Sequence, residues 1–324
     1  MSFQCAWWLQ NPHLQTAWPF LFRQRHHFPT REERFELIDG DFIDAVWAGN
    51  SSGPIVIILS GVEGHINSTY VNAMLANVCA AGWRGLFLHY RNCSASTNRL
   101  ERYYHIGDTG DLMNVISIIR HREPKTIMAA VGFSLGGNVL LKWLGEMNNR
   151  SPFRAAAAIS APFMLAQTNT MLEKGAGRMY ERYIIQMMRK AILKKFKHHP
   201  SPPVDLAKLH RLTTFIDFDT HITAPLHGFD NVQSYYEHAS CCFYLKKITT
   251  PCLVINALDD PLVPPSVIPE LSAFSSSTRV EQYQHGGHLG FVTGKYPGIA
   301  EYWVEQHVTQ FFRPLLCTKK KITT

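Results

Sequence analysis

The sequence has no apolar stretch that approaches the ~20 consecutive residues needed to span a bilayer as a helix. Residues 1–8 also lack the basic stretch followed by an apolar one that marks a secretory signal peptide. Both absences favour a location inside the cell. We therefore expect a cytoplasmic protein, and peripheral contact with the inner face of a membrane stays open.

Cysteine is sparse, and its seven positions are scattered without any C-x-x-C spacing. An odd number without that spacing argues against a disulfide framework and against a structural zinc site. His285 and His288 are three residues apart, but no third ligand follows at a spacing typical of metal sites. We expect the protein to use neither a metal ion nor another cofactor.

Acidic residues are outnumbered, since 25 aspartates and glutamates stand against 32 lysines and arginines, which gives a net charge of +7. Residues 319–321 form a basic tail, and a second excess lies within residues 171–198. No recognised nucleic-acid-binding motif accompanies them, so no nucleic-acid partner is expected. Anionic lipid is at least as good a candidate, and a solvated basic face is the simplest interpretation.

The most informative stretch that is present is Gly132-Phe133-Ser134-Leu135-Gly136. It follows an apolar run, residues 126–131, and precedes a helix-like run, residues 137–144. A strand, a sharp turn with a serine at its tip and a helix together form a nucleophile elbow. The glycines two positions before and after Ser134 leave room for the turn. The helix N-terminus offers backbone N–H groups to developing negative charge.

Strand-like and helix-like runs alternate along much of the chain, which predicts an α/β fold with a mainly parallel sheet and helices on both faces. A hairpin around Asp39-Gly40 begins the sheet. A helix is expected from Ser68, its N-cap, to Gly82, and further helices near residues 108–121, 137–144 and 297–312. Eight strands are expected, at residues 34–37, 42–47, 54–59, 85–90, 126–131, 155–160, 251–256 and 278–283.

The alternation of strands and helices lapses between Pro162 and Pro251. We interpret residues 163–245 as a helical cap or lid that is inserted into a single domain spanning residues 1–324. In α/β folds ligands bind beyond the carboxyl ends of the strands, and the insertion is expected over that edge.

A serine hydroxyl is a weak nucleophile at neutral pH, so Ser134 needs a base and an acid that orients this base. Asp259 and Asp260 follow the strand at residues 251–256. We favour Asp260 because a proline and then a Val-Pro pair come after it, as in the acid turn of hydrolases. Asp259 stays as the alternative, and its simplest role is that of a turn residue bonded to its own backbone.

The base is expected after the strand at residues 278–283, where His285-Gly286-Gly287-His288 follows. We favour His288 over His285, because the two glycines before it make a flexible loop that brings the ring close to Ser134. The sequence therefore predicts a triad of Ser134, Asp260 and His288.

A tetrahedral intermediate also needs two N–H donors for its oxyanion. One is expected from the amide of Leu135, directly after the serine. The other is expected from residues 60–64, after the strand at residues 54–59, where glycines let the backbone approach a substrate. We select the amide of Val62, although a plain glycine-rich turn would have the same composition.

With these residues in hand, the chain resembles the α/β-hydrolase superfamily and, more narrowly, the YheT-like hydrolases, also called the AB hydrolase 4 family. The resemblance implies that Ser134, Asp260 and His288 are the triad and that carboxylic esters are hydrolysed. Eukaryotic members act on phospholipids or other acyl esters, so the resemblance extends to a lipid substrate. The blocks that carry it run over nearly the whole chain, and the first is the most specific: Asn11-Pro12-His13-Leu14-Gln15-Thr16, then residues 61–64, 104–112, 160–163 and 286–291.

Two blocks depart from the family pattern. Ser60-Gly61 stands where the family usually has His-Gly, and Arg91-Asn92-Cys93-Ser94-Ala95 stands where it usually has Arg-Gly-Cys-Ser-Gly. The second change removes two glycines from a loop beside the site. Neither change touches the triad, and both concern the substrate pocket.

Residues 171–198 combine many methionines and isoleucines with eight lysines and arginines against two glutamates. A cationic helix with an apolar face is suited to a membrane surface, but a cap helix that packs on the core with its lysines solvated is the simpler interpretation. We expect a lid that contacts acyl chains, and both interpretations of its basic face stay open.

The sequence thus predicts a serine esterase that acts on small-molecule or lipid esters through an acyl-enzyme. An acyltransferase would use the same residues, with another acceptor in place of water. A lipid-binding protein without catalysis is the alternative from a different class, and the ordered serine, aspartate and histidine argue against it.

Overall fold

The computed structural model describes residues 2–317, so the basic tail at residues 319–321 lies outside the described part. Its centre is an eight-stranded sheet in the spatial order β1-β2-β4-β3-β5-β6-β7-β8. Strands β3 to β8 run parallel to one another, whereas β2 pairs antiparallel with both β1 and β4, and this mainly parallel sheet confirms the predicted fold class. The strands are β1 (Thr30–Glu36), β2 (Phe42–Gly49), β3 (Ile55–Leu59), β4 (Arg84–Leu88), β5 (Met128–Phe133), β6 (Phe153–Ile159), β7 (Cys252–Ala257) and β8 (Thr278–Tyr283).

Burial explains why the apolar runs of the sequence form the central strands. Every residue of β3, β5 and β7 is buried, because helices cover both faces of the sheet there. The edge strands β1 and β8 include exposed positions and carry charged residues. The turn between β1 and β2 is the one expected, and Gly40 within it has a φ of +83°, a conformation that favours glycine.

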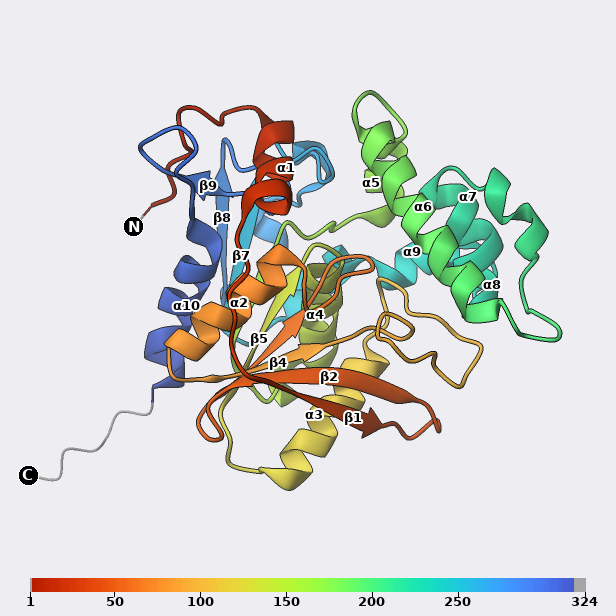
Figure 1. The fold of residues 1–324 in the computed structure, drawn as a ribbon, viewed down its shortest axis with the longest axis horizontal. Coiled ribbons are helices and arrows are strands. Elements are labelled where there is room, and N and C mark those ends of the chain that lie inside the picture. The colour runs from red at the N-terminus through yellow and green to blue at the C-terminus, as the bar shows by residue number, and fades with distance from the viewer. Residues whose placement is uncertain (1, 318–324) are drawn as a thin grey trace, which may run out of the picture.

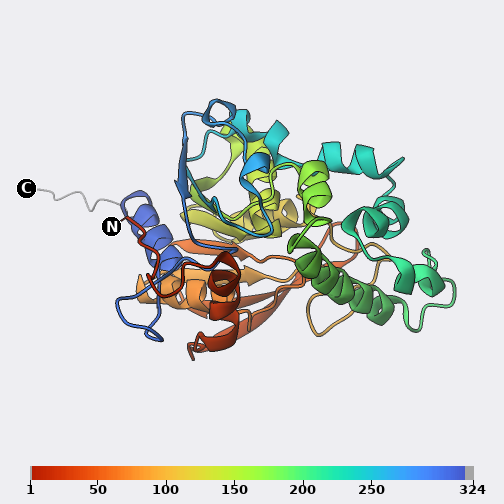
Figure 2. The same cartoon turned by 90° about the horizontal axis from the view of Figure 1, so that it is seen from above.

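Helices cover both faces of the sheet (Figures 1 and 2). The helices α2 (Thr69–Ala80) and α10 (Trp303–Leu316) contact each other over one face, where Val71, Leu75, Val308 and Phe312 are buried. The helices α3 (Gly110–Arg122) and α4 (Leu135–Met147) lie on the other face. Helix α4 follows β5 directly, and this places the elbow at the carboxyl end of a central strand.

The segment between β6 and β7 is helical and extends to one side of the sheet (Figures 1 and 2). Residues 163–245, which we interpreted as an inserted cap, lie within this segment. No helix of the described residues is long and apolar enough to cross a membrane. The helices of this insertion are α5 (Leu165–Leu172), α6 (Gly177–Phe196), α7 (Phe215–Phe218), α8 (Ala224–Leu226) and α9 (Val232–Ala239).

The structure contains one helix, α1 (Pro12–Phe22), that the periodicity of the sequence did not predict. Its start nevertheless carries recognisable signals. The Asn11 side chain accepts hydrogen bonds from the N–H groups of His13 and Leu14 at 2.9 and 3.2 Å, and proline occupies the first helical position.

Two local predictions are wrong. The last helix begins at Trp303 and not near residue 297, because β10 (Glu301–Tyr302) first pairs with β9 (Val292–Thr293). Ser68 stands at the N-cap of α2, but its side chain does not cap the helix. Its hydroxyl instead accepts a hydrogen bond from the His65 N–H at 3.1 Å, so it stabilises the preceding turn.

Candidate active site

Ser134 lies at the sharp turn between β5 and α4, with a φ of +51° that a non-glycine residue adopts rarely. Its N–H donates to the carbonyl oxygen of Ile159 at 2.8 Å, which ties the turn to β6. The turn depends on the flanking glycines. A Cβ on Gly132 would lie 2.2 Å from the carbonyl oxygen of Gly136, and one on Gly136 would lie 2.5 Å from that of Ser60.

The structure brings Ser134, His288 and Asp260 together in one hydrogen-bonded chain. His288 Nε2 lies 3.0 Å from Ser134 Oγ, and His288 Nδ1 lies 2.9 Å from Asp260 Oδ2. The Asp260 carboxylate is buried, and its Oδ1 accepts the N–H groups of Leu262 and Val263 at 2.8 and 3.0 Å. Because these bonds fix the carboxylate, they also fix the orientation of the imidazole.

The two alternatives that the sequence left open pair with each other, away from the serine. His285 Nδ1 lies 3.3 Å from Asp259 Oδ2, and the His285 side chain is 47% exposed. Asp259 Oδ1 accepts the Gly287 N–H at 2.9 Å, so this residue stabilises the loop that carries His288. Within residues 2–317 no three histidine, cysteine, aspartate or glutamate side chains converge in a way that could hold a metal ion.

Helix α1 supports the loop that carries His288. The His288 N–H donates to Thr16 Oγ1 at 2.9 Å. The buried Gln15 side chain bridges Val292, accepting its N–H at 2.8 Å and donating to its carbonyl oxygen at 3.1 Å. A Cβ on Gly290 would lie 2.3 Å from the carbonyl oxygen of Gln15, so the loop and the helix are in close backbone contact.

Two backbone amides beside Ser134 donate no hydrogen bond within the described residues, and they are those of Val62 and Leu135. Their neighbours are all engaged. In the loop after β3, residues 60–64, the Gly61 N–H donates to the Tyr70 hydroxyl at 3.0 Å, and the Gly64 N–H donates to the carbonyl oxygen of Gly61. At the elbow the amides of residues 134, 136 and 137 donate to carbonyl oxygens. The two amides chosen from the sequence as oxyanion donors are thus available to a ligand.

Glu63 and two tyrosines hold the loop at residues 60–64 in place. Glu63 has a φ of +53°, and its N–H donates to the Tyr104 hydroxyl at 2.9 Å. The hydroxyls of Tyr103 and Tyr104 both donate to Glu63 Oε1. Burial raises the pKa of the Glu63 carboxyl, although these hydrogen bonds oppose the rise. Sequence analysis missed this network, and its signal was a charged residue inside a glycine turn.

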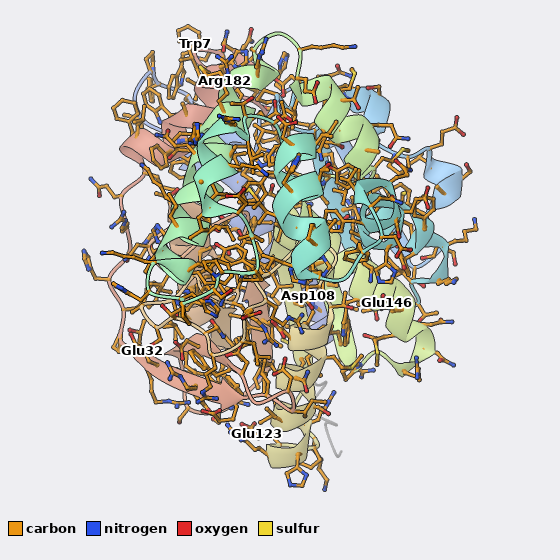
Figure 3. All side chains as sticks on the ribbon, turned by 90° about the vertical axis from the view of Figure 1, so that its right-hand side faces the viewer. Trp7, Glu32, Asp108, Glu123, Glu146 and Arg182 are labelled. Carbon is orange, nitrogen blue, oxygen red and sulfur yellow. The ribbon has the colours of Figure 1, made fainter. Side chains whose placement is uncertain are left out.

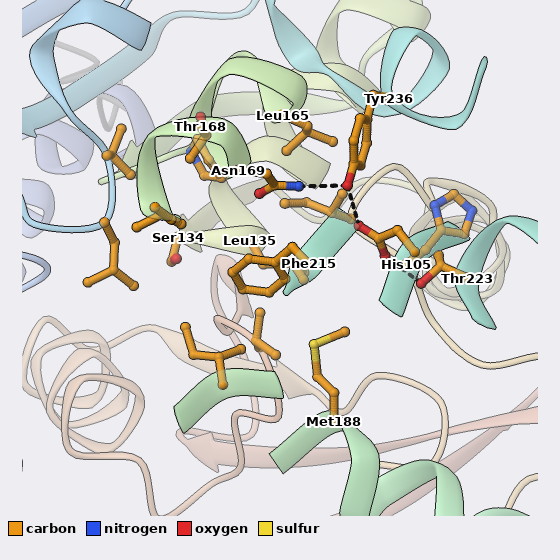
Figure 4. A pocket seen from close by; sticks show the side chains of 18 of the residues that line it. His105, Ser134, Leu135, Leu165, Thr168, Asn169, Met188, Phe215, Thr223 and Tyr236 are labelled. Atoms are coloured by element: carbon orange, nitrogen blue, oxygen red, sulfur yellow. Dashed lines mark hydrogen bonds between the residues drawn. The ribbon is translucent and has the colours of Figure 1, made fainter. Parts of the chain in front are cut away.

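A pocket of about 100 Å³ opens beside Ser134 (Figure 4). Val62, Leu135 and His288 line it near the serine. The helical insertion supplies most of the remaining wall, which is largely apolar and includes Leu165, Leu172, Ile184, Met188 and Phe215. Leu172, Ile184 and Met188 belong to residues 171–198, which were expected to contribute apolar side chains to the pocket.

Comparison with known proteins decides the family. No protein-family model matches the chain. The chain is 35% identical to the Escherichia coli (strain K12) protein named "Putative esterase YheT" over 316 residues. The aligned residues cover 95% of this chain and 92% of that protein. The chain belongs to the YheT-like family of α/β-hydrolases.

More distant similarities agree with this family. The human protein named "Phospholipase ABHD3" is 26% identical over 282 residues, covering 84% of this chain and 69% of that protein. The solved structure of the Pyrococcus furiosus esterase Pf2001 covers 90% of this chain and 92% of its own at 16% identity, with a TM-score of 0.58, and it shows the shared fold. This YheT-like protein is an α/β-hydrolase of the esterase and lipase type.

The departure from the family pattern at Asn92 has a structural explanation. Asn92 has a φ of +66°, so this position needs a glycine or one of the few residues that tolerate the left-handed region, and asparagine is one of them. Its side chain also stabilises the loop, because the backbone N–H of Asn92 and that of Asn98 each donate to the side-chain oxygen of the other residue. Lys195 of α6 donates to the Asn92 side chain at 3.2 Å and to the carbonyl oxygen of Leu100 at 2.6 Å. This lysine of the insertion is therefore half-buried and bound to the loop.

Proposed function

We propose that this YheT-like protein hydrolyses carboxylic esters through a triad of Ser134, His288 and Asp260. One observation carries the proposal. A serine hydroxyl at a strained elbow lies 3.0 Å from an imidazole nitrogen, and the other nitrogen of that ring lies 2.9 Å from a buried carboxylate. This is the arrangement in which a serine becomes a nucleophile at neutral pH.

In the first half of the reaction, His288 Nε2 takes the proton of Ser134 Oγ as the oxygen attacks the carbonyl carbon of the ester. Asp260 holds the ring in the tautomer with its proton on Nδ1 and stabilises the imidazolium that forms. The C–O bond to the alcohol then breaks, His288 returns the proton to the departing oxygen, and an acyl-enzyme on Ser134 remains. In the second half, His288 deprotonates a water molecule, which attacks the acyl carbon and releases the acid.

The amides of Val62 and Leu135 are the proposed oxyanion hole. Both line the pocket, and neither donates to another group among the described residues. They are therefore free to donate to the negative charge that develops on the carbonyl oxygen. Removal of one such donor in other hydrolases lowers the rate by about 10²–10³-fold.

A lipid or another acyl ester is the proposed substrate class. The wall of the pocket is formed largely by leucine, isoleucine, methionine and phenylalanine, which favour an apolar chain next to the reacting ester. The name of the human relative, a phospholipase, points in the same direction. We further propose that residues 163–245 act as the cap of a single domain spanning the chain.

Hydrolysis of p-nitrophenyl esters tests the proposed function. Wild-type protein is expected to hydrolyse them, and Ser134→Ala is expected to lose at least about 10³-fold in kcat/KM. Ser266→Ala is the matched control, because this serine is exposed and lies outside the pocket lining. Wild-type protein that is folded but inactive on every acyl length would contradict the proposal.

We also propose that the outer surface of α1 and α6 contacts anionic membranes. Leu14, Met179 and Tyr183 are more than half exposed there, and Arg178 and Arg182 are exposed beside them. A stacked contact and a 2.9 Å hydrogen bond between His13 and Tyr180 join the two helices. Figure 3 shows Arg182 at the same end of the molecule as the exposed Trp7, with Glu32 and Glu123 toward the opposite end.

Vesicle flotation tests this contact. Wild-type protein is expected to float with vesicles that contain an anionic phospholipid at low salt and to stay behind with zwitterionic ones. The double change Arg178→Glu and Arg182→Glu is expected to abolish flotation. Arg154→Glu is the control, because this exposed residue lies near the start of β6, at the opposite edge of the sheet from the pocket. Equal flotation of wild type and the double variant would refute the contact.

A further inference from the structure

The end of the pocket that is remote from Ser134 is polar. Asp219 lies there, and its two carboxylate oxygens accept the hydroxyl of Thr223 at 2.6 Å and that of Tyr236 at 2.9 Å. The side-chain amide of Asn169 donates in turn to the Tyr236 hydroxyl at 2.8 Å. Figure 4 shows this chain of bonds on one side of the pocket and Ser134 on the other.

The backbone is irregular at this point. Residues Asp219–Thr223 form one turn of π-helix between α7 and α8, and the Thr223 hydroxyl bonds to the Asp219 carboxylate across this turn. Single π-helical turns occur frequently at functional sites. The turn directs two polar side chains into a wall that is otherwise mostly apolar.

A buried carboxylate in such a wall needs an explanation. Asp219 is 6% exposed, and within residues 2–317 no lysine, arginine or histidine forms an ion pair with it. Two neutral hydroxyl donors compensate only part of the desolvation of a carboxylate. The two hydroxyls leave part of this cost unmet, so a ligand that donates a hydrogen bond is a natural counterpart of the carboxylate.

The hydrogen-bond directions define the chemistry of this counterpart. Thr223 and Tyr236 already use their hydrogens on Asp219, so the capacity that remains on these three side chains is in acceptor lone pairs, chiefly those of the carboxylate. His105 and Asn169 line the same end and can still donate, so they complement a ligand that also accepts, as a hydroxyl does. The ionised form of Asp219 would repel a phosphate or carboxylate. A group that donates hydrogens, either a hydroxyl or a protonated amine, would complete the site.

We propose that Asp219, with Thr223 and Tyr236, binds a hydrogen-bond donor at the far end of the ester substrate. This proposal rests on the proposed function, since it specifies the substrate of that same site. The substrate then has three parts: an ester at Ser134, an apolar chain along Leu165, Phe215 and Met188, and a terminal hydroxyl or ammonium group at Asp219.

Matched ester series test the proposal. One series consists of p-nitrophenyl esters of an alkanoic acid and of its ω-hydroxy and ω-amino counterparts with equal chain length. The second series places the same three ends on the alcohol, as acetates of an alkanol, a diol and an amino alcohol. For each ester kcat/KM is measured with wild type, Asp219→Asn, Tyr236→Phe and the control Asp230→Asn, whose side chain is exposed.

In at least one series we expect wild type to prefer one polar end over the plain ester by about tenfold. The preferred end identifies the donor as hydroxyl or ammonium. Asp219→Asn is expected to reduce this preference about tenfold, because its single acceptor oxygen already receives Thr223 or Tyr236. Tyr236→Phe is expected to reduce it in the same sense, and Asp230→Asn is expected to leave it unchanged.

The proposal is overturned if the plain ester is the best substrate in both series, or if Asp219→Asn keeps the wild-type preference. It is also overturned if Asp219→Asn lowers the activity on all esters by the same factor, which is the result of a purely structural role. Hydrolysis of the plain esters by wild type and its loss in Ser134→Ala report separately on the proposed function.

Discussion

Replacement of Gln15 by leucine tests how helix α1 supports the catalytic loop. The Val292 N–H is buried and bonds only to the Gln15 side chain among the described residues, so Gln15→Leu leaves it unpaired at a cost of about 1–3 kcal/mol. The carbonyl oxygen of Val292 keeps a 3.1 Å bond from the Ala6 N–H, so its loss is smaller, about 1 kcal/mol. We expect a total destabilisation of roughly 2–4 kcal/mol.

For a chain of 324 residues this corresponds to a fall in Tm of about 3–6 °C, measured by scanning calorimetry. Ester hydrolysis is expected to fall with it, because the same helix bonds to the backbone of His288. Gln10→Leu is the matched control, since the Gln10 side chain is exposed and its replacement is expected to change stability by less than about 0.5 kcal/mol. Equal melting temperatures for the two variants would refute the reasoning.

Three further changes give distinct outcomes. Asp260→Asn is expected to lower kcat for ester hydrolysis by about 10³–10⁴-fold through the wrong imidazole tautomer, whereas Asp259→Asn is expected to lower it less than about tenfold; similar losses in both would contradict the assignment. Gly136→Ala is expected to prevent normal folding, seen as a loss of the cooperative thermal transition, because its Cβ would meet a backbone oxygen at 2.5 Å, whereas Gly110→Ala, with its nearest neighbour at 3.6 Å, is expected to fold normally. Burial raises the pKa of Asp219 from 3.8 to about 7, so the folded state binds this proton more tightly than the unfolded state does. The free energy of unfolding therefore falls as the pH rises from 3.8 through 7. Between pH 5 and pH 8, the unfolding free energy of wild type, measured with denaturant, is therefore expected to fall by roughly 3 kcal/mol more than that of Asp219→Asn. An equal change in both proteins would contradict this expectation.

The sheet and the residues at its carboxyl edge could be predicted because their signals are local. A buried strand is a short apolar run, and Ser134, Asp260 and His288 each follow such a run within a few residues. Parallel strands bring their carboxyl ends to the same edge of the sheet, so three distant segments were expected to meet. The structure brings the three side chains within hydrogen-bonding distance.

The support of the site could not be predicted, because it depends on contacts between distant segments. Gln15 and Thr16 bond to residues more than 270 positions away, and nothing in their local sequence indicates that loop. Asp219 lies in a helical insertion where neither strand alternation nor a motif marks a site. Its position in the pocket follows only from how the insertion packs.

Covalent labelling of Ser134 tests the central claim most directly. A fluorophosphonate probe reacts with a serine only when a base and an oxyanion site activate it. After reaction with a stoichiometric amount of probe, intact-mass and peptide mass spectrometry are expected to show one phosphonyl group on wild type, located at Ser134. No adduct is expected on Ser134→Ala, and a much slower reaction is expected on His288→Ala. A wild-type protein that is folded but unlabelled, or an adduct on another residue, would contradict the account.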